Sequence, residues 1–149
     1  MADAMIRVSV QREPIDIAAE LAMVESTGAG GIATFSGHVR ADDGVSVLDL
    51  EHWPGATEAA LARLAECAAA RWSLTAASIV HRIGPMRPGE RIVLVVAAAA
   101  HRGAALEACA FLIDRLKTDA PFWKRETRGD DARWVEARGT DDAAAARWT

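Results

Sequence analysis

The sequence predicts an α+β fold in which helices layer a sheet, rather than a doubly wound parallel sheet. Segments that alternate apolar and polar residues, as half-buried strands do, are interleaved imperfectly with segments of helical spacing. The continuous apolar run at 91–100 is typical of a central, buried strand. A length of 149 residues, 51% of them apolar, fits one domain over residues 1–149 with a core of its own.

The first half of the chain is expected to contain three strands and two helices. Residues 6–11 alternate as a strand, and residues 15–24 carry apolar side chains at helical spacing before the turn STGAGG. Residues 32–39 and 47–53 are predicted to be two strands joined by the polar turn RADDGVS, and we expect them to form an antiparallel pair. A helix with an apolar face follows, and Thr57 is its predicted N-cap.

The second half is expected to add a central strand, a helix and a hairpin. Residues 78–84 are predicted to form a strand and PMRPGE a turn, after which the buried strand 91–100 runs into a helix over 103–117. Beyond Pro121, FWKRET and RWVEA are predicted to be two strands joined by the turn RGDD. The segment DDAAAARWT is predicted to be a short last helix.

Composition and spacing argue against several classes of function. The formal net charge of -4 and the scattered basic residues disfavour nucleic-acid binding. No run of about eighteen apolar residues occurs and the N-terminus lacks a secretory pattern, so we expect a cytoplasmic protein that does not enter a membrane. Cys67 and Cys109 lack CxxC spacing and are expected to be small buried residues. His38, His52 and His81 lie singly in strands, so we expect local hydrogen bonds and no metal site.

Cationic side chains stand at the ends of several expected elements. His101 and Arg102 lie where the buried strand meets the next helix, whose N-terminal N–H groups attract anions. They could equally cap the sheet edge or pair with surface acids. Arg40 follows a strand in which Gly37 suggests a β-bulge or a close backbone approach. Taken alone, this arginine could be a solvated residue beside a hairpin.

The segment KTDAPFWKRE carries the remaining cations. Lys117 falls at the end of its helix, where the helix dipole favours a cation in any case. Lys124 lies between Trp123 and Arg125, and crowding by cations or apolar rings lowers the pKa of a lysine toward use as an acid or base. A solvated lysine paired with an acid such as Glu126 is the commoner outcome.

These candidates share one property, because each is a hydrogen-bond donor or a cation at the end of an element. They are Arg40, His101, Arg102, Lys117, Lys124 and Arg125. Together they predict a pocket for a small, strongly anionic ligand. The sequence has no G-x-S-x-G elbow and no cysteine in an evident electropositive setting. We therefore expect the reacting atom to arrive on a partner or cosubstrate.

The order and spacing of seven segments resemble the large, catalytic subunit of molybdopterin synthase. They are TFSGHVR, LDLEHWPGATEAAL, RW, IVHRIGPMRPGE, IVLVVAAAAHRGAALEA, IDRLKTDAPFWKRE and RWVEAR, within about residues 31–138. The most specific blocks are HR followed by a helix, and LKxxxPFWKRE. Trp53 and Ala56 stand where the family often has tyrosine and methionine, and Leu106 replaces a phenylalanine. These apolar changes leave every cation in place.

The resemblance implies an α/β hammerhead fold with an additional antiparallel β subdomain, and a homodimer within a heterotetramer. A small ubiquitin-like sulfur-carrier subunit is expected to dock at each outer end, with its thiocarboxylated Gly-Gly tail in the pocket of the large subunit. Sulfur is then expected to pass to cyclic pyranopterin monophosphate in two transfers, which form the dithiolene of molybdopterin. No further cofactor is implied, and the carrier supplies the nucleophile that the sequence lacks.

The resemblance also implies which residues act. Lys117 and Lys124 are expected to be the catalytic residues. Lys117 is expected beside the incoming thiocarboxylate, and Lys124 is expected either to act as acid or base on the pterin or to hold the hemisulfurated intermediate. The substrate contacts are His38, Val39, Arg40, His101, Arg102, Lys117, Lys124, Arg125 and Glu126. Arg138 is a supplementary candidate. The alternative is a non-catalytic module that only binds a carrier tail or a pterin, whereas a phosphodiesterase would require a metal cluster or general base that the sequence does not show.

Overall fold

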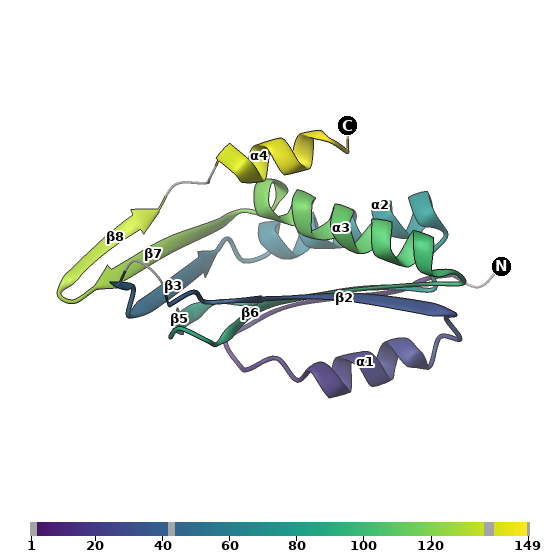
Figure 1. The fold of residues 1–149 in the computed structure, drawn as a ribbon, viewed down its shortest axis with the longest axis horizontal. Helices are drawn as coiled ribbons and strands as arrows, with labels where there is room; N and C mark the ends of the chain where they lie inside the picture. Colours follow the sequence, from purple (N-terminus) through teal and green to yellow (C-terminus); the bar gives the residue numbers. More distant parts are fainter. Residues whose placement is uncertain (1–2, 42–43, 136–138, 149) are drawn as a thin grey trace.

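Two four-stranded sheets and four helices form the chain, which the computed structural model describes over residues 3–41, 44–135 and 139–148. The elements are β1 (Met5–Gln11), α1 (Ile17–Glu25), β2 (Gly31–His38), β3 (Val47–His52), α2 (Ala56–Trp72), β4 (Ala76–Arg82), β5 (Gly84–Met86), β6 (Arg91–Ala99), α3 (Arg102–Asp119), β7 (Phe122–Arg128), β8 (Asp131–Val135) and α4 (Gly139–Ala146). The β6 sheet has the strand order β1-β4-β6-β2, and the β7 sheet has the order β5-β3-β7-β8. Helices α2 and α3 cover one face of the β6 sheet and α1 covers the other (Figure 1).

The β6 sheet is the buried framework. Every residue of β4 is buried, as is β6 from Val93 to Ala99, because helices cover both faces of these interior strands. Strand β6 is antiparallel to β4 and β2, whereas β1 and β4 are parallel. The predicted α+β class is confirmed, with an α/β hammerhead and the β7 sheet as its additional antiparallel subdomain. The predicted central strand at 91–100 is also confirmed.

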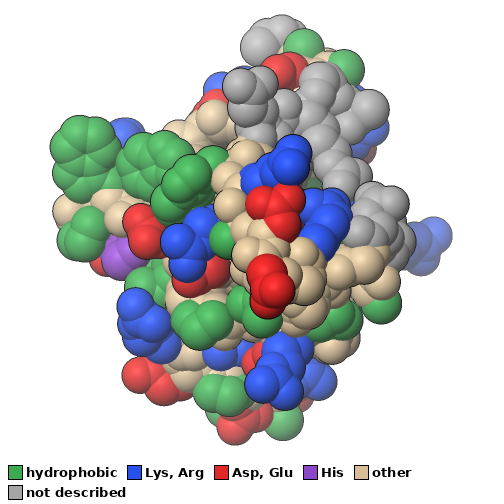
Figure 2. Space-filling view, turned by 90° about the vertical axis from the view of Figure 1, so that its left-hand side faces the viewer, with side chains coloured by type: hydrophobic (Ala, Val, Ile, Leu, Met, Phe, Trp, Pro, Cys, Tyr) green, Lys and Arg blue, Asp and Glu red, His purple; other side chains and the backbone are tan. Residues whose placement is uncertain are grey.

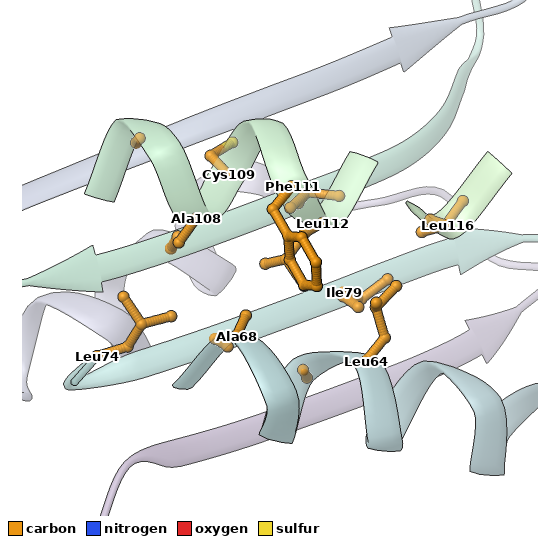
Figure 3. Close-up of a cluster of buried hydrophobic side chains, with 14 of the residues drawn as sticks. Leu64, Ala68, Leu74, Ile79, Ala108, Cys109, Phe111, Leu112 and Leu116 are labelled. Atoms are coloured by element: carbon orange, nitrogen blue, oxygen red, sulfur yellow. The ribbon is translucent and has the colours of Figure 1, made fainter. Parts of the chain in front are cut away.

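The main core lies between the β6 sheet and helices α2 and α3. Figure 3 shows Leu64 of α2, Phe111 and Leu112 of α3 and Ile79 of β4 converging there. A fully buried leucine such as Leu112 contributes about 2 kcal/mol to folding by leaving water. In the described part of the chain, no helix combines the length and the apolar character needed to cross a membrane.

The β7 sheet carries the predicted hairpin. Strand β7 lies between β3 and β8, with Lys124 opposite Leu50 on one side and Val135 on the other. The predicted last helix is present as α4, which packs on α3. Strand β5 occupies residues 84–86, where the sequence predicted the end of a strand and the start of a turn.

The predicted antiparallel pairing of strands 32–39 and 47–53 is wrong. Strand β2 pairs with β6, whereas β3 pairs with β5 and β7 in the other sheet. The polar turn between β2 and β3 suggested a local hairpin. Strand β2 instead pairs with the apolar strand β6, because this pairing completes the sheet that helices cover on both faces.

Two smaller predictions about α2 are also wrong. The N-cap is Gly55, whose N–H donates to the Glu58 carboxylate at 2.9 Å, and Thr57 is buried in the first turn. The Thr57 hydroxyl accepts a hydrogen bond from the N–H of Trp53 and donates one to the carbonyl oxygen of Pro121, so it does not cap the helix. Cys67 is exposed, because the buried face of α2 is formed by residues such as Leu64 and Ala68. Cys109 is buried, as predicted.

Candidate functional site

A cationic pocket opens where the end of β2, the end of α3 and the β7 sheet meet. Its volume is about 360 Å³. The polar side chains that line it are His38, Arg40, Lys117, Lys124, Glu126 and Arg128, and Val39, Leu48 and Ile92 belong to its apolar wall. Four cations thus face one acid among the described lining residues, which favours an anionic ligand. Figure 2 views the molecule from this end, where Lys and Arg side chains gather next to acidic ones.

The end of β2 brings His38 and Arg40 to the pocket. A register shift between Gly37 and His38 interrupts the pairing with β6, so the expected bulge is present. Glycine is required there, because a Cβ on Gly37 would lie 2.8 Å from Val93 Cγ1. The His38 ring hydrogen-bonds the Ser36 hydroxyl at 2.8 Å, which helps hold it at the rim of the pocket.

Both lysines of the chain lie in this pocket. The sequence has two lysines and fifteen arginines, and Lys117 in the last turn of α3 and Lys124 in β7 are both half-buried. An ammonium is compact and its pKa responds to its surroundings, whereas a guanidinium stays charged. The two lysines are therefore confined to one pocket. The scarcity of lysine is visible in the sequence only when Lys and Arg are counted separately, because the total of basic residues hides it.

Strand β7 determines which of its polar residues reach the pocket. Lys124, Glu126 and Arg128 share one face, because alternate residues of a strand point the same way. Arg128 lies 2.8 Å from the Glu126 carboxylate, so the acid of the lining is partly neutralised by its neighbour. Arg128 is not among the predicted site residues, although a period of two from Lys124 points to it.

Arg125 lies on the other face of β7. Its side chain is 47% exposed and lies 3.9 Å from the Asp49 carboxylate. Its guanidinium is also over the Trp134 ring, 5.9 Å from the ring centroid. Within a single chain, Arg125 therefore does not line the pocket that contains Glu126 and the two lysines.

His101 and Arg102 also lie outside the pocket of their own chain. Both are exposed at the N-terminal end of α3, where the His101 side chain makes no capping hydrogen bond. A helical rise of 1.5 Å per residue separates His101 from Lys117 by about 24 Å. A Cβ on Gly31 would lie 3.0 Å from Arg102 Cα, so the start of β2 runs beside this helix end. Arg138 lies outside the described residues.

A buried histidine at the end of β4 stacks on the first residue of β7. His81, at the end of β4, is 3% exposed, and its ring stacks on Phe122 with a centroid separation of 3.9 Å. Its Nδ1 hydrogen-bonds the carbonyl oxygen of Arg82 at 2.8 Å, as expected for a locally satisfied histidine. Burial, joined by the charges of Lys117 and Lys124, lowers the pKa of His81 to about 3 despite this hydrogen bond. The ring is therefore neutral at pH 7.

Neither cysteine is placed to attack a ligand in the pocket. Burial raises the pKa of the Cys109 thiol to about 11, so this thiol stays protonated. Cys67 lines a different groove, together with Arg71 and Trp148. No group of three or more His, Cys, Asp or Glu side chains suited to a metal ion occurs in the ranges that the structure describes. The pocket offers concentrated positive charge and hydrogen-bond donors, without a thiol.

Several known proteins are similar to this chain in sequence and fold. The chain matches the family model described as MoaE protein over residues 10–119. A molybdopterin synthase catalytic subunit from Mesorhizobium japonicum is 51% identical over 146 residues, which cover 95% of this chain and 92% of that protein. The solved structure of molybdopterin cofactor biosynthesis protein E from Burkholderia multivorans has a TM-score of 0.84 and 48% identity, covering 97% of each chain. Molybdopterin synthase from Staphylococcus aureus has a TM-score of 0.80 and 30% identity, covering 86% of this chain and 96% of that one.

Proposed function

This chain belongs to the MoaE protein family, and we propose that it acts as the catalytic subunit of a molybdopterin synthase. It transfers sulfur from the thiocarboxylated C-terminus of a small ubiquitin-like carrier subunit to cyclic pyranopterin monophosphate. The product carries the dithiolene of molybdopterin. The working assembly is a homodimer of this chain within a heterotetramer that includes the carrier.

The observation that supports this proposal most strongly is the pairing of the two lysines in a cationic pocket. Both reactants are anions, because the carrier tail ends in a thiocarboxylate and the substrate carries a cyclic phosphate. A pocket with four cations and one acid attracts both, and it brings them together at the half-buried Lys117 and Lys124. The absence of a thiol from the pocket lining fits a reaction in which the carrier delivers the sulfur.

We assign the roles within the pocket by position. Lys117, at the end of α3, neutralises negative charge on the incoming sulfur, and Lys124 acts as acid or base on the pterin. Arg40 binds the phosphate, with Val39 and His38 beside it at the end of β2. Cations already fixed around the developing charge stabilise the transition state, and removing one such group costs on the order of a hundredfold in rate.

Glu126 and Arg125 act indirectly in this proposal. Glu126 lines the pocket and orients the neighbouring Arg128, which lies 2.8 Å away. Arg125 faces away from the pocket and orients β7 through Asp49. Arg125 is thus expected to contribute less than any cation of the lining.

His101 and Arg102 enter the site through the second copy of the chain. Strand β2 is an edge of its sheet, and in the described ranges its outer edge pairs with no strand. Antiparallel pairing of two β2 edges about a two-fold axis between Thr34 and Phe35 would bring the partner's Gly31 opposite His38. Gly31 runs beside the N-terminus of α3, so Arg102 of the partner subunit would then approach the pocket. The exposed apolar side chain of Phe35 lies on this strand and supports such a contact.

Mixing two inactive variants tests this shared site. Arg102→Ala and Lys124→Ala each impair every site in their own homodimers. In a mixed dimer, both defects fall on one site and the other site is intact, so random mixing restores about a quarter of the parental activity. Activity that stays at the level of the single variants would contradict a shared site.

Two further parts of the proposal concern organisation and location. Residues 1–149 act as one domain, because α3 and the His81–Phe122 stack join the two sheets. The protein works in the cytoplasm, since Cys67 and Cys109 are both free thiols, which suits a reducing compartment.

The deciding experiment is molybdopterin formation from cyclic pyranopterin monophosphate and thiocarboxylated carrier under single-turnover conditions. We expect the parent to form molybdopterin. Lys117→Ala and Lys124→Ala should still bind the carrier but should form molybdopterin much more slowly than the parent. Arg63→Ala is the matched control, because Arg63 is exposed on α2 and lines a different groove. A parent that binds the carrier and makes no product would instead be a non-catalytic carrier-binding module.

A further inference from the structure

One face of β7 forms a long side of the lysine pocket. Lys124, Glu126 and Arg128 line the pocket at every second position, so their side chains follow one another at intervals of about 6.6 Å. Lys124 and Arg128 are four residues apart in the strand, so their backbones are about 13 Å from each other. The pocket is therefore elongated along β7, with a lysine toward one end of this side and an arginine at the other.

Solvent exposure distinguishes the two ends of this side. Lys124 is half-buried and the Glu126 side chain is 18% exposed, whereas the Arg128 side chain is 42% exposed. Lys117 lies toward the Lys124 end, because only a short connection joins α3 to the start of β7. The turn between β7 and β8, directly after Arg128, lies at one end of the molecule (Figure 1). Arg128 is therefore at the mouth of the pocket and the lysines are deeper.

An ion pair holds the Arg128 guanidinium against the pocket wall. Its Nη2 lies 2.8 Å from a Glu126 carboxylate oxygen, on the same face of β7. A guanidinium has five N–H donors in one plane, so it can bind a carboxylate and a carbonyl oxygen of a ligand at the same time. The apolar side chain of Val45 also lines the pocket, and the neighbouring Ser46 N–H donates to the Thr127 carbonyl oxygen at 2.8 Å. The mouth thus combines a fixed donor with an apolar wall.

An extended peptide matches this side of the pocket. Its backbone advances about 3.3 Å per residue and repeats every two residues, as β7 does. When the terminal carboxyl group of such a peptide lies at the lysines, the residue about four positions earlier lies beside Arg128. Glycine residues offer only backbone polar groups, so an arginine binds a glycine-rich tail through its carbonyl oxygens. A compact anion is too short to contact both ends.

We propose that Arg128 binds a backbone carbonyl oxygen of the carrier tail about four residues before its C-terminus, while the terminal group lies at Lys117 and Lys124. This contact holds the tail at the mouth and makes its affinity depend on its length. The identification of the peptide as the tail of a sulfur carrier rests on the proposed function, whereas the contact between Arg128 and an extended backbone does not. No bond forms or breaks at Arg128.

Glycine peptides of two lengths test this contact without the carrier. Acetyl-diglycine spans the lysine end only, acetyl-hexaglycine extends past Arg128, and the acetyl group removes the N-terminal charge from both. In protein labelled with ε-¹³C-lysine, the side-chain signals report binding in the pocket, because both lysines of the sequence line it. We expect the parent to bind acetyl-hexaglycine about tenfold more tightly than acetyl-diglycine, as one hydrogen bond to a charged donor allows.

Variants of Arg128 separate a local contact from general attraction by charge. Arg128→Gln should abolish most of the gain from length and bind acetyl-diglycine within about twofold of the parent, because a charge about 13 Å away is screened at physiological salt. Arg128→Lys, which keeps a charged donor, should recover part of the gain. Arg63→Gln, in a different groove on α2, is the control and should match the parent.

Two results would overturn the proposal. One is a parent that does not prefer the longer peptide, and the other is an Arg128→Gln variant that weakens both peptides equally or neither of them.

The thiocarboxylated carrier separates this contact from the proposed function. Arg128→Gln should lower the rate about tenfold at limiting carrier, and saturating carrier should restore the parental rate, because the contact holds the tail away from the reacting atoms. A rate that stays tenfold lower at saturating carrier would contradict this binding role. A parent that forms no molybdopterin would end the proposed function, and the peptide affinities would still decide whether Arg128 binds an extended backbone.

Discussion

The β6 sheet and the β7 sheet share the geometry of extended strands and differ in what surrounds them. In the β6 sheet, β4 and most of β6 are buried beneath helices on both faces, and the core there is apolar. In the β7 sheet, β7 exposes Trp123 and Arg125 on one face and lines the pocket with Lys124 on the other. The covered framework therefore lies in one sheet, whereas the other sheet supplies one wall of the pocket.

Specific contacts join the two regions. His81 stacks on Phe122 across the seam, and the Thr57 hydroxyl donates to the carbonyl oxygen of Pro121 at 2.9 Å. Both contacts hold the connection between α3 and β7, which joins Lys117 to Lys124. The buried sheet thus sets the geometry of the pocket through this connection.

The largest expected effect is a loss of stability in acid that originates at the seam. The pKa of His81 is about 3 in the folded chain, below its ordinary value of 6.5. Between these values the unfolded chain binds the proton and the folded chain does not, so the free energy of unfolding falls as pH is lowered. The loss is about 1.4 kcal/mol per pH unit and roughly 5 kcal/mol over the whole window.

Urea unfolding between about pH 7 and pH 4 measures this slope. His81→Phe removes the titrating ring, while the other ionisable groups contribute to both proteins and largely cancel in the difference. Stability curves that run parallel in the parent and in His81→Phe would show that the folded chain does not hold this ring neutral.

A cavity in the core of the β6 sheet should lower the free energy of unfolding and leave the single-turnover rate nearly unchanged. Leu112 is fully buried between α2, α3 and the β6 sheet, and Leu112→Ala is expected to lower the free energy of unfolding by about 3 kcal/mol. The single-turnover rate of the folded fraction should change less than about threefold. A large loss of rate at full folding would mean that the core and the pocket are not separable.

Removal of one positive charge from the pocket should lower the rate and leave the free energy of unfolding nearly unchanged. Lys124→Gln keeps most of the side-chain length and removes the charge, so we expect the rate to fall on the order of a hundredfold. The free energy of unfolding should stay within about 1 kcal/mol of the parent, because Lys124 is only half-buried. Arg63→Gln serves as the control, because Arg63 is exposed on α2 and lines a different groove, and it should leave both quantities unchanged.

The hydroxyl at the junction should couple the two regions weakly. Thr57→Val keeps the shape of the side chain and removes its hydrogen bonds to the N–H of Trp53 and the carbonyl oxygen of Pro121. We expect a loss of about 1.5 kcal/mol in the free energy of unfolding and a severalfold lower rate. Thr57→Ser, which retains the hydroxyl, should recover most of the rate; if it does not, the hydrogen bonds are not what couples the junction to the pocket.

The smallest expected difference in rate is between variants on the two faces of β7. Arg128→Gln removes a cation from the pocket lining and should lower the rate about tenfold, whereas Arg125→Gln should change it only twofold or threefold, roughly. Parallel single-turnover assays decide between them. A greater loss from Arg125→Gln would show that its face contacts a reactant or a partner in the assembly.

Periodicity predicted most of the elements because burial leaves a local pattern. The apolar run at 91–100, the alternation at 6–11 and the helical spacing over 103–117 each reflect which faces are covered, and all three elements are present. The pairing of β2 left no such pattern. Its partner β6 is distant in the sequence, and the polar turn that follows β2 pointed to a local hairpin instead.

The site residues divide in the same way. Lys117 and Lys124 were found because they stand at the ends of predicted elements and within a specific block, and the structure brings both to one pocket. His81 looked like an ordinary strand histidine, since stacking on a distant ring cannot be read from neighbours in the sequence. The structure places Arg128 in the pocket lining and Arg125 on the opposite face of β7, and the sequence does not reveal which face of a strand is covered.

The sequence by itself determined the α+β class, the order of the elements, the family, and the cations available for an anionic ligand. These follow from side-chain chemistry and local periodicity, which each segment carries wherever it lies. Only the tertiary structure decided which strands pair, which face of β7 lines the pocket, and that the buried His81 of β4 stacks on Phe122 of β7. Such facts arise from contacts between segments far apart in the chain, where the burial of apolar surface selects one arrangement among many that the local patterns allow.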